Sequence, residues 1–322
     1  MNRELKVTNI METKYLTYPH DLKKINLPES VAAIGFFDGI HKGHQAVINQ
    51  ALDYAKKHNK KCSIITFHPH PSVVLNSPNK TVKYITPQTE KERLLNEMGV
   101  DQVFVIKFNE ELSQVKPDEF IEHFIVGLNI IHLVAGFDFS FGHKGQGNMT
   151  NIENFAKNRF TFEALSKVEI NESKVSSTKI RKLLAEGLVK EAGYLLGRPF
   201  TYEGTVVTGD KRGRLIGFPT ANLETNEEYL LPKKGVYAVK LILCNETYYG
   251  MANLGFVPTF KEDMSEPKIE VYIFDFNKDI YGETIKVEWL EFIREEQKFS
   301  GIEEIKAQLK ADEITIRKII NK

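Results

Sequence analysis

The stretch GFFDGIHKGH, residues 35–44, places three glycines, two histidines and one aspartate in ten positions. It follows the apolar run SVAAI, which is typical of a buried strand. In residues 45–58, apolar side chains recur at the three- and four-residue spacing of an amphipathic helix. The stretch is therefore predicted to be the loop between a strand and a helix.

The same alternation continues along the first half of the chain. Strands that alternate with helices form βαβ units, in which the strands are parallel. We therefore expect an α/β domain with a Rossmann-like parallel sheet. The predicted strands cover residues 30–37, 61–67, 102–108 and 130–137, and the predicted helices cover 86–97, a segment from Pro117 and the glycine-stopped segment 176–187.

The second half has a different character, because its apolar runs are separated by turn residues and not by long helices. The pattern predicts an antiparallel barrel or sandwich, closed by a helix from Ile302 to Leu309. A boundary near residues 188–198 gives two domains, 1–187 and 188–322. The β-rich runs are residues 200–207, 235–243, 246–254, 268–276 and 284–290.

The bulk composition limits the classes of function. A chain of 322 residues is too long for one typical core, so two domains are expected. Lys plus Arg and Asp plus Glu both number 43, and this balance argues against a nucleic-acid partner. The two cysteines, Cys62 and Cys244, are far apart and do not suggest a disulfide framework. With no secretory signal and no apolar span of ~20 residues, we expect a cytoplasmic protein without a membrane partner. The sequence leaves the oligomeric state open.

Three interpretations fit the two histidines of GFFDGIHKGH. A zinc site needs three or four protein ligands, and beyond His41 and His44 the nearest candidates are His68 and His70, after the next strand. A surface turn with incidental histidines is the second interpretation. The third is a phosphate site, because a helix N-terminus offers free backbone N–H groups and a positive dipole to an anion.

The phosphate interpretation has the strongest physical basis. Gly39 and Gly43 allow a ligand to approach the backbone closely. His41 and His44 are i,i+3 neighbours on the first helical turn, so their imidazoles face the same way. Two imidazole N–H donors beside a helix N-terminus stabilise a pentacoordinate phosphorus better than a ground-state phosphate. We therefore favour phosphate binding over metal ligation.

A second motif, SSTKIR at residues 176–181, opens the helix late in the first half. Its hydroxyls and N-terminal amides suit phosphate oxygens, and Arg181 adds a cation. An ordinary capped helix is the alternative interpretation. Two such motifs in one domain, each opening a helix, are more specific than either alone.

The second half contains GFPTAN at residues 217–222, preceded by the basic stretch GDKRGR. Thr220 and Asn222 alternate along an extended segment, so both side chains face one way and offer oxygen ligands to Mg²⁺. Farther on, Glu270 lies in the alternating run KIEVYIFDF. By itself Glu270 is better explained as the polar position of an alternating strand.

These motifs carry a resemblance to known families. The first half, with G-x-F-D-G-x-H-x-G-H and S-S-T-x-I-R, resembles the nucleotidylyltransferase superfamily. The second half resembles the riboflavin kinase family through GRPF, GFPTAN, KGVYAV, ANLGFVPTF, E-x-Y-x-F-D-F, YGETIKVEW and IREEQKF, in that order. Over residues 15–310 the chain resembles the bacterial bifunctional riboflavin kinase/FMN adenylyltransferases, also called FAD synthetases.

The resemblance implies a function for each half, with ATP as co-substrate and Mg²⁺ as cofactor. The barrel would phosphorylate riboflavin to FMN, and the α/β domain would transfer AMP from ATP to FMN, which gives FAD and pyrophosphate. The implied catalytic residues are Glu270 as the base, with His41, His44 and Arg181 on ATP, and the implied metal ligands are Thr220 and Asn222. Implied ATP or phosphate contacts are Gly35, Phe37, Asp38, Gly39, Gly43, Ser177, Thr178, Lys211, Gly217 and Pro219. Implied flavin contacts are Asp138, Phe139, Asn253 and Arg294.

Two alternatives remain beside this interpretation. One is a nucleotidylyltransferase with a different phosphorylated acceptor, and GFPTAN argues against it because such an enzyme needs no second ATP site. The other is an inactive flavin- or nucleotide-binding regulator. The presence together of the catalytic residues and metal ligands named above argues against such a loss of activity.

Overall fold

The computed structural model describes residues 11–20, 27–76, 82–170, 173–209, 212–256 and 267–321. The chain forms two compact units, Met1–Ser177 and Thr178–Lys322, and each is described here by itself. The division falls inside the helix predicted at 176–187. Within the second unit the end of this helix is bonded to the segment that precedes barrel strand β13 (Gly235–Leu243), because Lys233 N donates to Leu184 O at 2.8 Å. The assignment of functional domains to 1–187 and 188–322 stays a prediction.

The first unit is built on a six-stranded parallel sheet in the order β1-β4-β3-β2-β5-β8. All four strands predicted in this half are present and parallel. The strands are β1 (Glu12–Leu16), β2 (Ser30–Ile34), β3 (Lys61–His68), β4 (Gln102–Lys107), β5 (Ile130–Gly136) and β8 (Thr161–Leu165). Two short hairpins flank it, β6 (Ser140–Phe141) with β7 (Gly147–Asn148), and β9 (Glu169–Ile170) with β10 (Ser173–Lys174).

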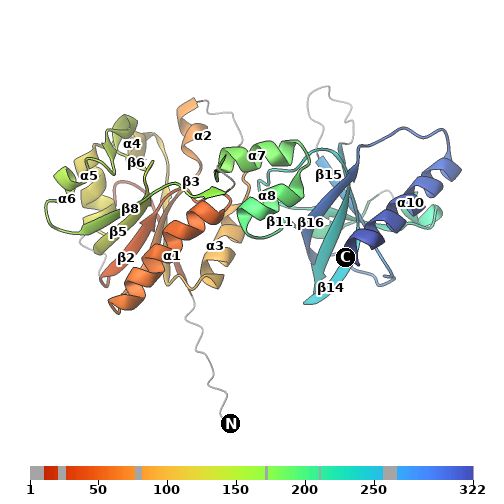
Figure 1. Cartoon of the computed structure of the whole chain (residues 1–322), viewed down its shortest axis with the longest axis horizontal. Helices are drawn as coiled ribbons and strands as arrows, with labels where there is room; N and C mark the ends of the chain where they lie inside the picture. Colours follow the sequence, from red (N-terminus) through yellow and green to blue (C-terminus); the bar gives the residue numbers. More distant parts are fainter. Residues whose placement is uncertain are drawn as a thin grey trace, which may run out of the picture. The chain divides into compact units, whose positions relative to one another are not determined.

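Helices cover both faces of this sheet, because its central strands are apolar on both sides. Figure 1 shows α1 (Lys42–Lys57) and α3 (Gln88–Glu97) on one side. Their buried residues pack with Val31, Ala33 and Val103. The other side is covered by α4 (Glu110–Ser113), α5 (Pro117–Ile121), the π-helical turn η2 (Glu122–Val126) and α6 (Glu153–Ala156). The remaining helical segments of this unit are α2 (Pro71–Asn76) and the 3₁₀ turn η3 (His143–Gly145).

The strand order decides where a ligand would bind. The chain runs from β2 outward through β3 and β4, and then returns to the other side of β2 with β5 and β8. In open α/β sheets the crevice beyond the carboxyl ends of the strands, at such a reversal, is where ligands bind. The loops that follow β2 and β5 are GFFDGIHKGH and the segment with Asp138, so both predicted contact regions leave the sheet there.

The second unit is a closed antiparallel barrel in the order β11-β12-β15-β14-β13-β16, so of the two predicted forms the barrel is the one observed. Its strands are β11 (Phe200–Val207), β12 (Thr220–Glu224), β13 (Gly235–Leu243), β14 (Glu246–Phe256), β15 (Pro267–Ile273) and β16 (Thr284–Arg294). Its helices are α7 (Ser177–Ala185), α8 (Val189–Leu196), α9 (Arg212–Leu215) and α10 (Ile302–Ile320). Gly187, with φ of 81°, follows the end of α7 as predicted.

The final helix is longer than the predicted Ile302–Leu309. It continues to Ile320 because Leu309, Ile316 and Ile320 pack against the outer face of the barrel. Figure 1 shows α10 lying along that face. Among the helices in the described parts of the chain, none combines the length and the apolar composition needed to cross a bilayer.

A buried ion pair helps to fasten α10 to the barrel. Arg294, at the end of β16, holds the carboxylate of Asp312 through Nη2 at 2.8 Å and Nε at 2.9 Å. The Asp312 side chain is 3% exposed. Replacement of one partner leaves the other charge poorly compensated, which costs on the order of 3 kcal/mol.

We therefore expect Asp312→Ala to lower the free energy of unfolding of the barrel by about that amount. Urea unfolding followed by the fluorescence of Trp289, the single tryptophan, measures it. Glu303→Ala, on the exposed first turn of the same helix, is the matched control. An Asp312→Ala barrel as stable as the control contradicts this role of the pair.

Candidate active sites

The loop after β2 has a strained backbone. Phe37 and Ile40 have φ of 51° and 38°, and Gly39 has φ of 94°. Positive φ is uncommon for residues with a side chain and is a real outlier for a β-branched one such as Ile40. Strain of this kind persists only where the surroundings enforce it, and it concentrates at functional sites.

Side chains from β3, α3 and the adjoining helix α1 hold this loop through its carbonyl groups. The Phe36 oxygen accepts from Thr66 Oγ1 at 3.1 Å and from Lys91 Nζ at 3.1 Å. The Ile40 oxygen accepts from Gln45 Nε2 at 2.8 Å. No spacing in the sequence points to Thr66 or Lys91, since only the long-range packing of β3 and α3 brings them to the loop.

The two histidines form a stacked pair at the start of α1. His41 is the N-cap residue, and its Nδ1 accepts from the backbone N–H of His44 at 3.2 Å. The ring centroids lie 3.6 Å apart with the planes 18° from parallel, as the i,i+3 spacing predicts. Because His41 Nδ1 is an acceptor, the neutral ring carries its proton on Nε2, where it can serve as a donor.

His44 is poised as a neutral imidazole. Burial, followed by the charges of His41 and Lys91, holds its pKa well below the usual histidine value. Its Nδ1 is buried and has no hydrogen-bond partner among the described residues. A buried nitrogen of this kind calls for a partner that the protein itself does not supply.

The SSTKIR motif meets the loop through Ser177, the first residue of α7. Its Oγ donates to the backbone oxygen of Asp38 at 2.9 Å, so the two predicted phosphate motifs are joined within the first unit. Thr178 and Arg181 follow on α7 and belong to the second unit. Their approach to the phosphate remains a prediction.

The other predicted contacts of the loop have structural partners as well. The Asp38 side chain is 4% exposed and accepts from Thr86 N at 3.1 Å, so it anchors the loop to the start of α3. A Cβ at Gly43 would press on the His41 ring, and one at Gly35 would press on the Phe37 ring. These glycines therefore allow the close packing that places the imidazoles.

Asp138 and Phe139 follow β5, as predicted, at the same edge of the sheet. The Asp138 carboxylate pairs with Lys174 Nζ at 2.7 Å, and Lys174 also lies over the Phe137 ring at 5.0 Å. Phe137 is 45% exposed. An exposed aromatic ring with a cation above it suits stacking with a flat ring system, and the sequence did not single out Phe137 or Lys174.

A row of polar side chains crosses three strands of the barrel. Asn222 of β12 pairs with Glu270 of β15, and Glu270 pairs with Asn253 of β14. Directly paired residues share one face of a sheet. The alternate positions Leu223 and Val271 are buried in the barrel, so this row lies on its outer face.

The amide of Asn222 is enclosed by neighbouring residues, and it is 6% exposed. Its Oδ1 is buried and has no hydrogen-bond partner among the described residues. A Cβ at Gly209 would overlap the same amide, so the GDKRGR segment approaches Asn222 as only glycine allows. An amide oxygen is a ligand that Mg²⁺ accepts, and the arrangement therefore fits a bound Mg²⁺–nucleotide.

The neighbours of this row are charged. Glu270 Oε1 pairs with Lys268 Nζ at 2.9 Å, and Asn253 Nδ2 lies 3.5 Å from Glu296 Oε1. Neither Lys268 nor Glu296 was predicted. Lys268 lies two residues before Glu270 on β15, so strand alternation places the two on one face, whereas Glu296 follows β16 and meets Asn253 only through the fold. Arg294 is engaged by Asp312, and its role as a flavin contact stays a prediction.

The rest of the GFPTAN segment frames this row. Thr220 pairs with Tyr272 on the same face, two residues before Asn222. Gly217, with φ of 86°, and Pro219 form the turn between α9 and β12. Lys211, a predicted phosphate contact, lies outside the described residues.

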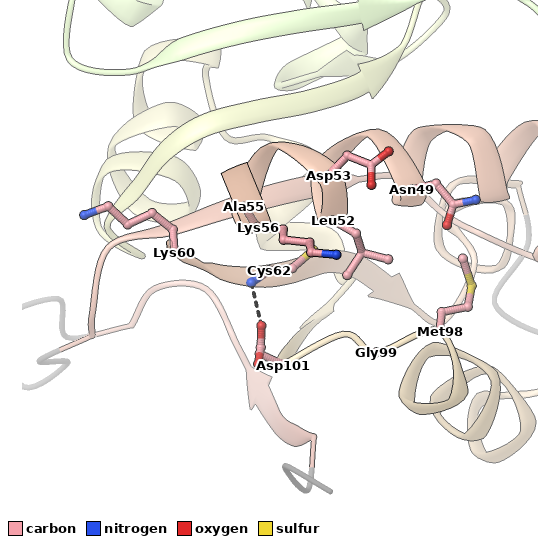
Figure 2. A pocket seen from close by; sticks show the side chains of 10 residues that line it. All are labelled: Asn49, Leu52, Asp53, Ala55, Lys56, Lys60, Cys62, Met98, Gly99 and Asp101. Atoms are coloured by element: carbon pink, nitrogen blue, oxygen red, sulfur yellow. Dashed lines mark hydrogen bonds between the residues drawn. The ribbon is translucent and has the colours of Figure 1, made fainter. Parts of the chain in front are cut away.

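A groove of about 560 Å³ lies elsewhere on the first unit. Figure 2 shows it between the end of α1 and the starts of β3 and β4, with Cys62 N bonded to Asp101 Oδ2 at 2.8 Å. This is the edge where the parallel strands begin, opposite the carboxyl edge that carries the histidines. The chemistry described above does not use this groove.

Metal ligation by the histidines has no further support in the part of the chain that the structure describes. There, no three His, Cys, Asp or Glu side chains gather as a metal site. The stacked imidazoles instead cap a helix N-terminus, where anions bind.

Comparisons with known proteins cover both units. The FAD synthetase family matches residues 23–179, and the riboflavin kinase family matches residues 196–320. A bifunctional riboflavin kinase/FMN adenylyltransferase from Listeria monocytogenes is 47% identical over 303 residues, which are 94% of this chain and 96% of that protein. Its counterpart from Bacillus subtilis is 43% identical with the same coverage.

A crystal structure from Streptococcus pneumoniae, described as a macrolide-efflux protein, shares the fold. Its TM-score is 0.87 at 36% identity, and the match covers 95% of this chain and 99% of that one. The description names a different activity from those of the two relatives, and it bears on this chain through the fold alone. The identities to both relatives extend over nearly the whole chain, and the chain belongs to the family of bifunctional riboflavin kinases/FMN adenylyltransferases.

Proposed function

We propose that this chain makes FAD from riboflavin in two ATP-dependent steps. The barrel phosphorylates riboflavin to FMN, and the α/β unit then transfers AMP from ATP to FMN. The observation that carries this proposal is that one family matches residues 23–179 and a second family matches residues 196–320 of the same chain. A nucleotidylyltransferase with another acceptor is not favoured, because it leaves the row of Asn222, Glu270 and Asn253 without a task.

In the first step a hydroxyl must become a nucleophile. The 5′-oxygen of riboflavin forms a bond to the γ-phosphorus of ATP, the bond to the bridging oxygen breaks, and ADP leaves. The hydroxyl proton passes to the carboxylate of Glu270, which acts as general base. Asn253, beside Glu270 in the row, supports the flavin, and Lys268 balances the negative charge of the carboxylate.

In the second step the nucleophile is already an anion. A phosphate oxygen of FMN attacks the α-phosphorus of ATP, the bond to the α,β-bridging oxygen breaks, and pyrophosphate leaves. Positioning and neutralisation of charge therefore suffice, and no base is needed. His41 and His44 donate to the phosphate oxygens at the N-terminus of α1, Ser177 and Thr178 bind at the start of α7, and Arg181 adds a cation.

A magnesium ion fits the kinase site on the chemistry of its donors. The unsatisfied Oδ1 of Asn222 and the hydroxyl of Thr220 would hold it, together with phosphate oxygens of ATP. When bound, Mg²⁺ neutralises charge that develops on the transferred phosphate. The protein's own contribution is to hold these oxygens on one rigid strand.

Labelled ATP tests the two steps separately. With γ-³²P-ATP and riboflavin, we expect label in FMN, and with α-³²P-ATP and FMN, we expect label in FAD. Label in neither flavin contradicts the proposal, and label from the α position alone would identify an adenylyltransferase without kinase activity.

Gly209→Ala should weaken the kinase step alone. The added methyl group overlaps the Asn222 amide, so it displaces the predicted metal and nucleotide position. We expect riboflavin phosphorylation to fall by on the order of 10²-fold, the cost of a misplacement of about 1 Å, with FMN adenylylation unchanged. Gly301→Ala, where a Cβ meets nothing within 4 Å and the backbone is extended, controls for glycine replacement in the second unit. Equal kinase rates in both variants argue against this role of Gly209.

We also propose a cytoplasmic location. Cys62 and Cys244 are both free thiols, which suits a reducing compartment.

A further inference from the structure

Lys91 is a buried lysine that neither predicted motif includes. It lies on α3 and is 2% exposed. A lysine is almost never fully buried unless it has a partner, because removal of the ammonium from water is costly. Its ammonium donates a hydrogen bond of 3.1 Å to the backbone oxygen of Phe36, near the start of GFFDGIHKGH.

That oxygen is the point at which the strained loop is held. The carbonyl of Phe36 belongs to the peptide that enters Phe37, whose φ is 51°. A return of Phe37 to an ordinary backbone angle would swing this carbonyl away from its two donors, Thr66 and Lys91. The ammonium therefore stabilises the backbone conformation of the loop, in which Gly39 and Ile40 also have positive φ and which positions the two imidazoles.

The charge of Lys91 also reaches the phosphate site. Burial lowers its pKa to about 8, while Asp38 in the loop and Glu92 on its own helix act in the opposite direction. Lys91 in turn helps to lower the pKa of His44 on α1. The ammonium thus contributes positive potential to the loop in which a polyphosphate would bind.

We propose that Lys91 is a positioning residue of the adenylyl-transfer site. Its ammonium holds the GFFDGIHKGH loop through the carbonyl oxygen of Phe36, and its charge adds to the positive potential that attracts the nucleotide phosphates. This inference rests on the proposed adenylyl transfer by the first unit. Lys91 acts through the loop, and the imidazoles touch the substrate.

Deprotonation of Lys91 has opposite consequences for activity and for stability. Above pH ~8 the ammonium loses its proton and with it its positive charge, so adenylyl transfer falls. The folded pKa lies below the ordinary value of 10.5, so between these two pH values the unfolded chain binds more protons. The free energy of unfolding therefore rises with pH in this window, and a loss of activity there does not arise from unfolding driven by Lys91.

The experiment compares the pH dependence of both half-reactions in the full-length chain. In the wild type, kcat/KM for FMN adenylylation should fall above pH ~8, while riboflavin phosphorylation in the other unit serves as the internal control. Lys91→Met keeps the aliphatic stem, and we expect it to lower FMN adenylylation on the order of 10²-fold. It should also remove the alkaline limb of the pH profile, which is the fall of kcat/KM above pH ~8. Lys91→Arg keeps the charge, and it should retain more activity than Lys91→Met with the limb moved to higher pH. Lys57→Met, at an exposed lysine of α1, is the matched control.

Hydrogen exchange of β2 and α1 reports whether each variant keeps the fold of the first unit. The inference is overturned if Lys91→Met folds and adenylylates FMN at the wild-type rate. It is also overturned if the folded variant keeps the same fall in activity above pH ~8. If Lys91→Met does not fold, the wild-type profile decides: a limb near pH 8 without loss of exchange protection supports the inference, and a flat profile overturns it. A wild type that forms no FAD from FMN at any pH would instead overturn the proposed function, although its riboflavin kinase activity could remain.

Discussion

We expect Glu270→Gln to abolish riboflavin phosphorylation and to leave the conversion of FMN to FAD intact. The substitution keeps the size of the side chain and removes its ability to take a proton. General base catalysis contributes about 10²–10⁴-fold, so the kinase rate should fall by that factor. The adenylyl transfer, whose nucleophile is already an anion, has no use for this carboxylate. Initial rates of FMN formation from riboflavin and of FAD formation from FMN measure the two effects in one preparation.

The ion pair between Glu270 and Lys268 requires a further control for this test. The glutamine amide cannot form the ion pair with Lys268, so a structural defect is the competing explanation. Lys268→Met breaks the same ion pair and retains the carboxylate, and it should keep far more kinase activity than Glu270→Gln. Glu246→Gln, at an exposed carboxylate at the start of β14, controls for loss of charge on the barrel. If Glu270→Gln phosphorylates riboflavin at the wild-type rate, Glu270 is not the base.

His44→Ala should have the reverse effect, with FMN adenylylation lowered on the order of 10²–10³-fold and riboflavin phosphorylation unchanged. This is the cost of removal of one donor that is aimed at a transition state. His44 is neutral at pH 7, because its pKa is held well below the usual value, so its contribution is an N–H donor and not a formal charge. Steady-state rates with FMN and ATP measure the loss.

A histidine on the same helix supplies the control. His58, the C-cap residue of α1, lies at the end of the helix away from the phosphate loop. His58→Ala should leave both activities near wild type. Near-normal FAD formation by His44→Ala would contradict the assignment of the loop as a phosphate site, whether or not the variant still phosphorylates riboflavin.

The parts of the fold that sequence predicted are those with strong local patterns. Apolar runs such as 102–108, alternating with amphipathic helices, are sufficient to predict a parallel sheet. The edge strands β1 and β8 were missed because ETKYL and TFEAL are short and half exposed, with no continuous apolar run. Helix α10 was predicted too short, because the charged residues Asp312 and Glu313 interrupt its apolar pattern. Only the fold shows that Asp312 is buried against Arg294 and that Ile316 and Ile320 continue the face that packs on the barrel.

The candidate sites divide in the same way. The i,i+3 spacing of His41 and His44 is local, and it predicted the shared direction of their rings. The contacts of Lys91 and Thr66 with the loop depend on packing between residues far apart in sequence, which no spacing reveals. Likewise, the alternation of Thr220 and Asn222 was readable, but their position beside Glu270 follows from the register of β12 against β15.

The central claim is that one chain converts riboflavin to FAD in two successive steps. Incubation of the purified protein with riboflavin, ATP and Mg²⁺, followed by chromatographic separation of the flavins over time, tests it most directly. The account predicts that FMN appears first and that FAD accumulates as FMN is consumed. Absence of any flavin turnover contradicts the claim as a whole, and FMN that accumulates without FAD contradicts its second step.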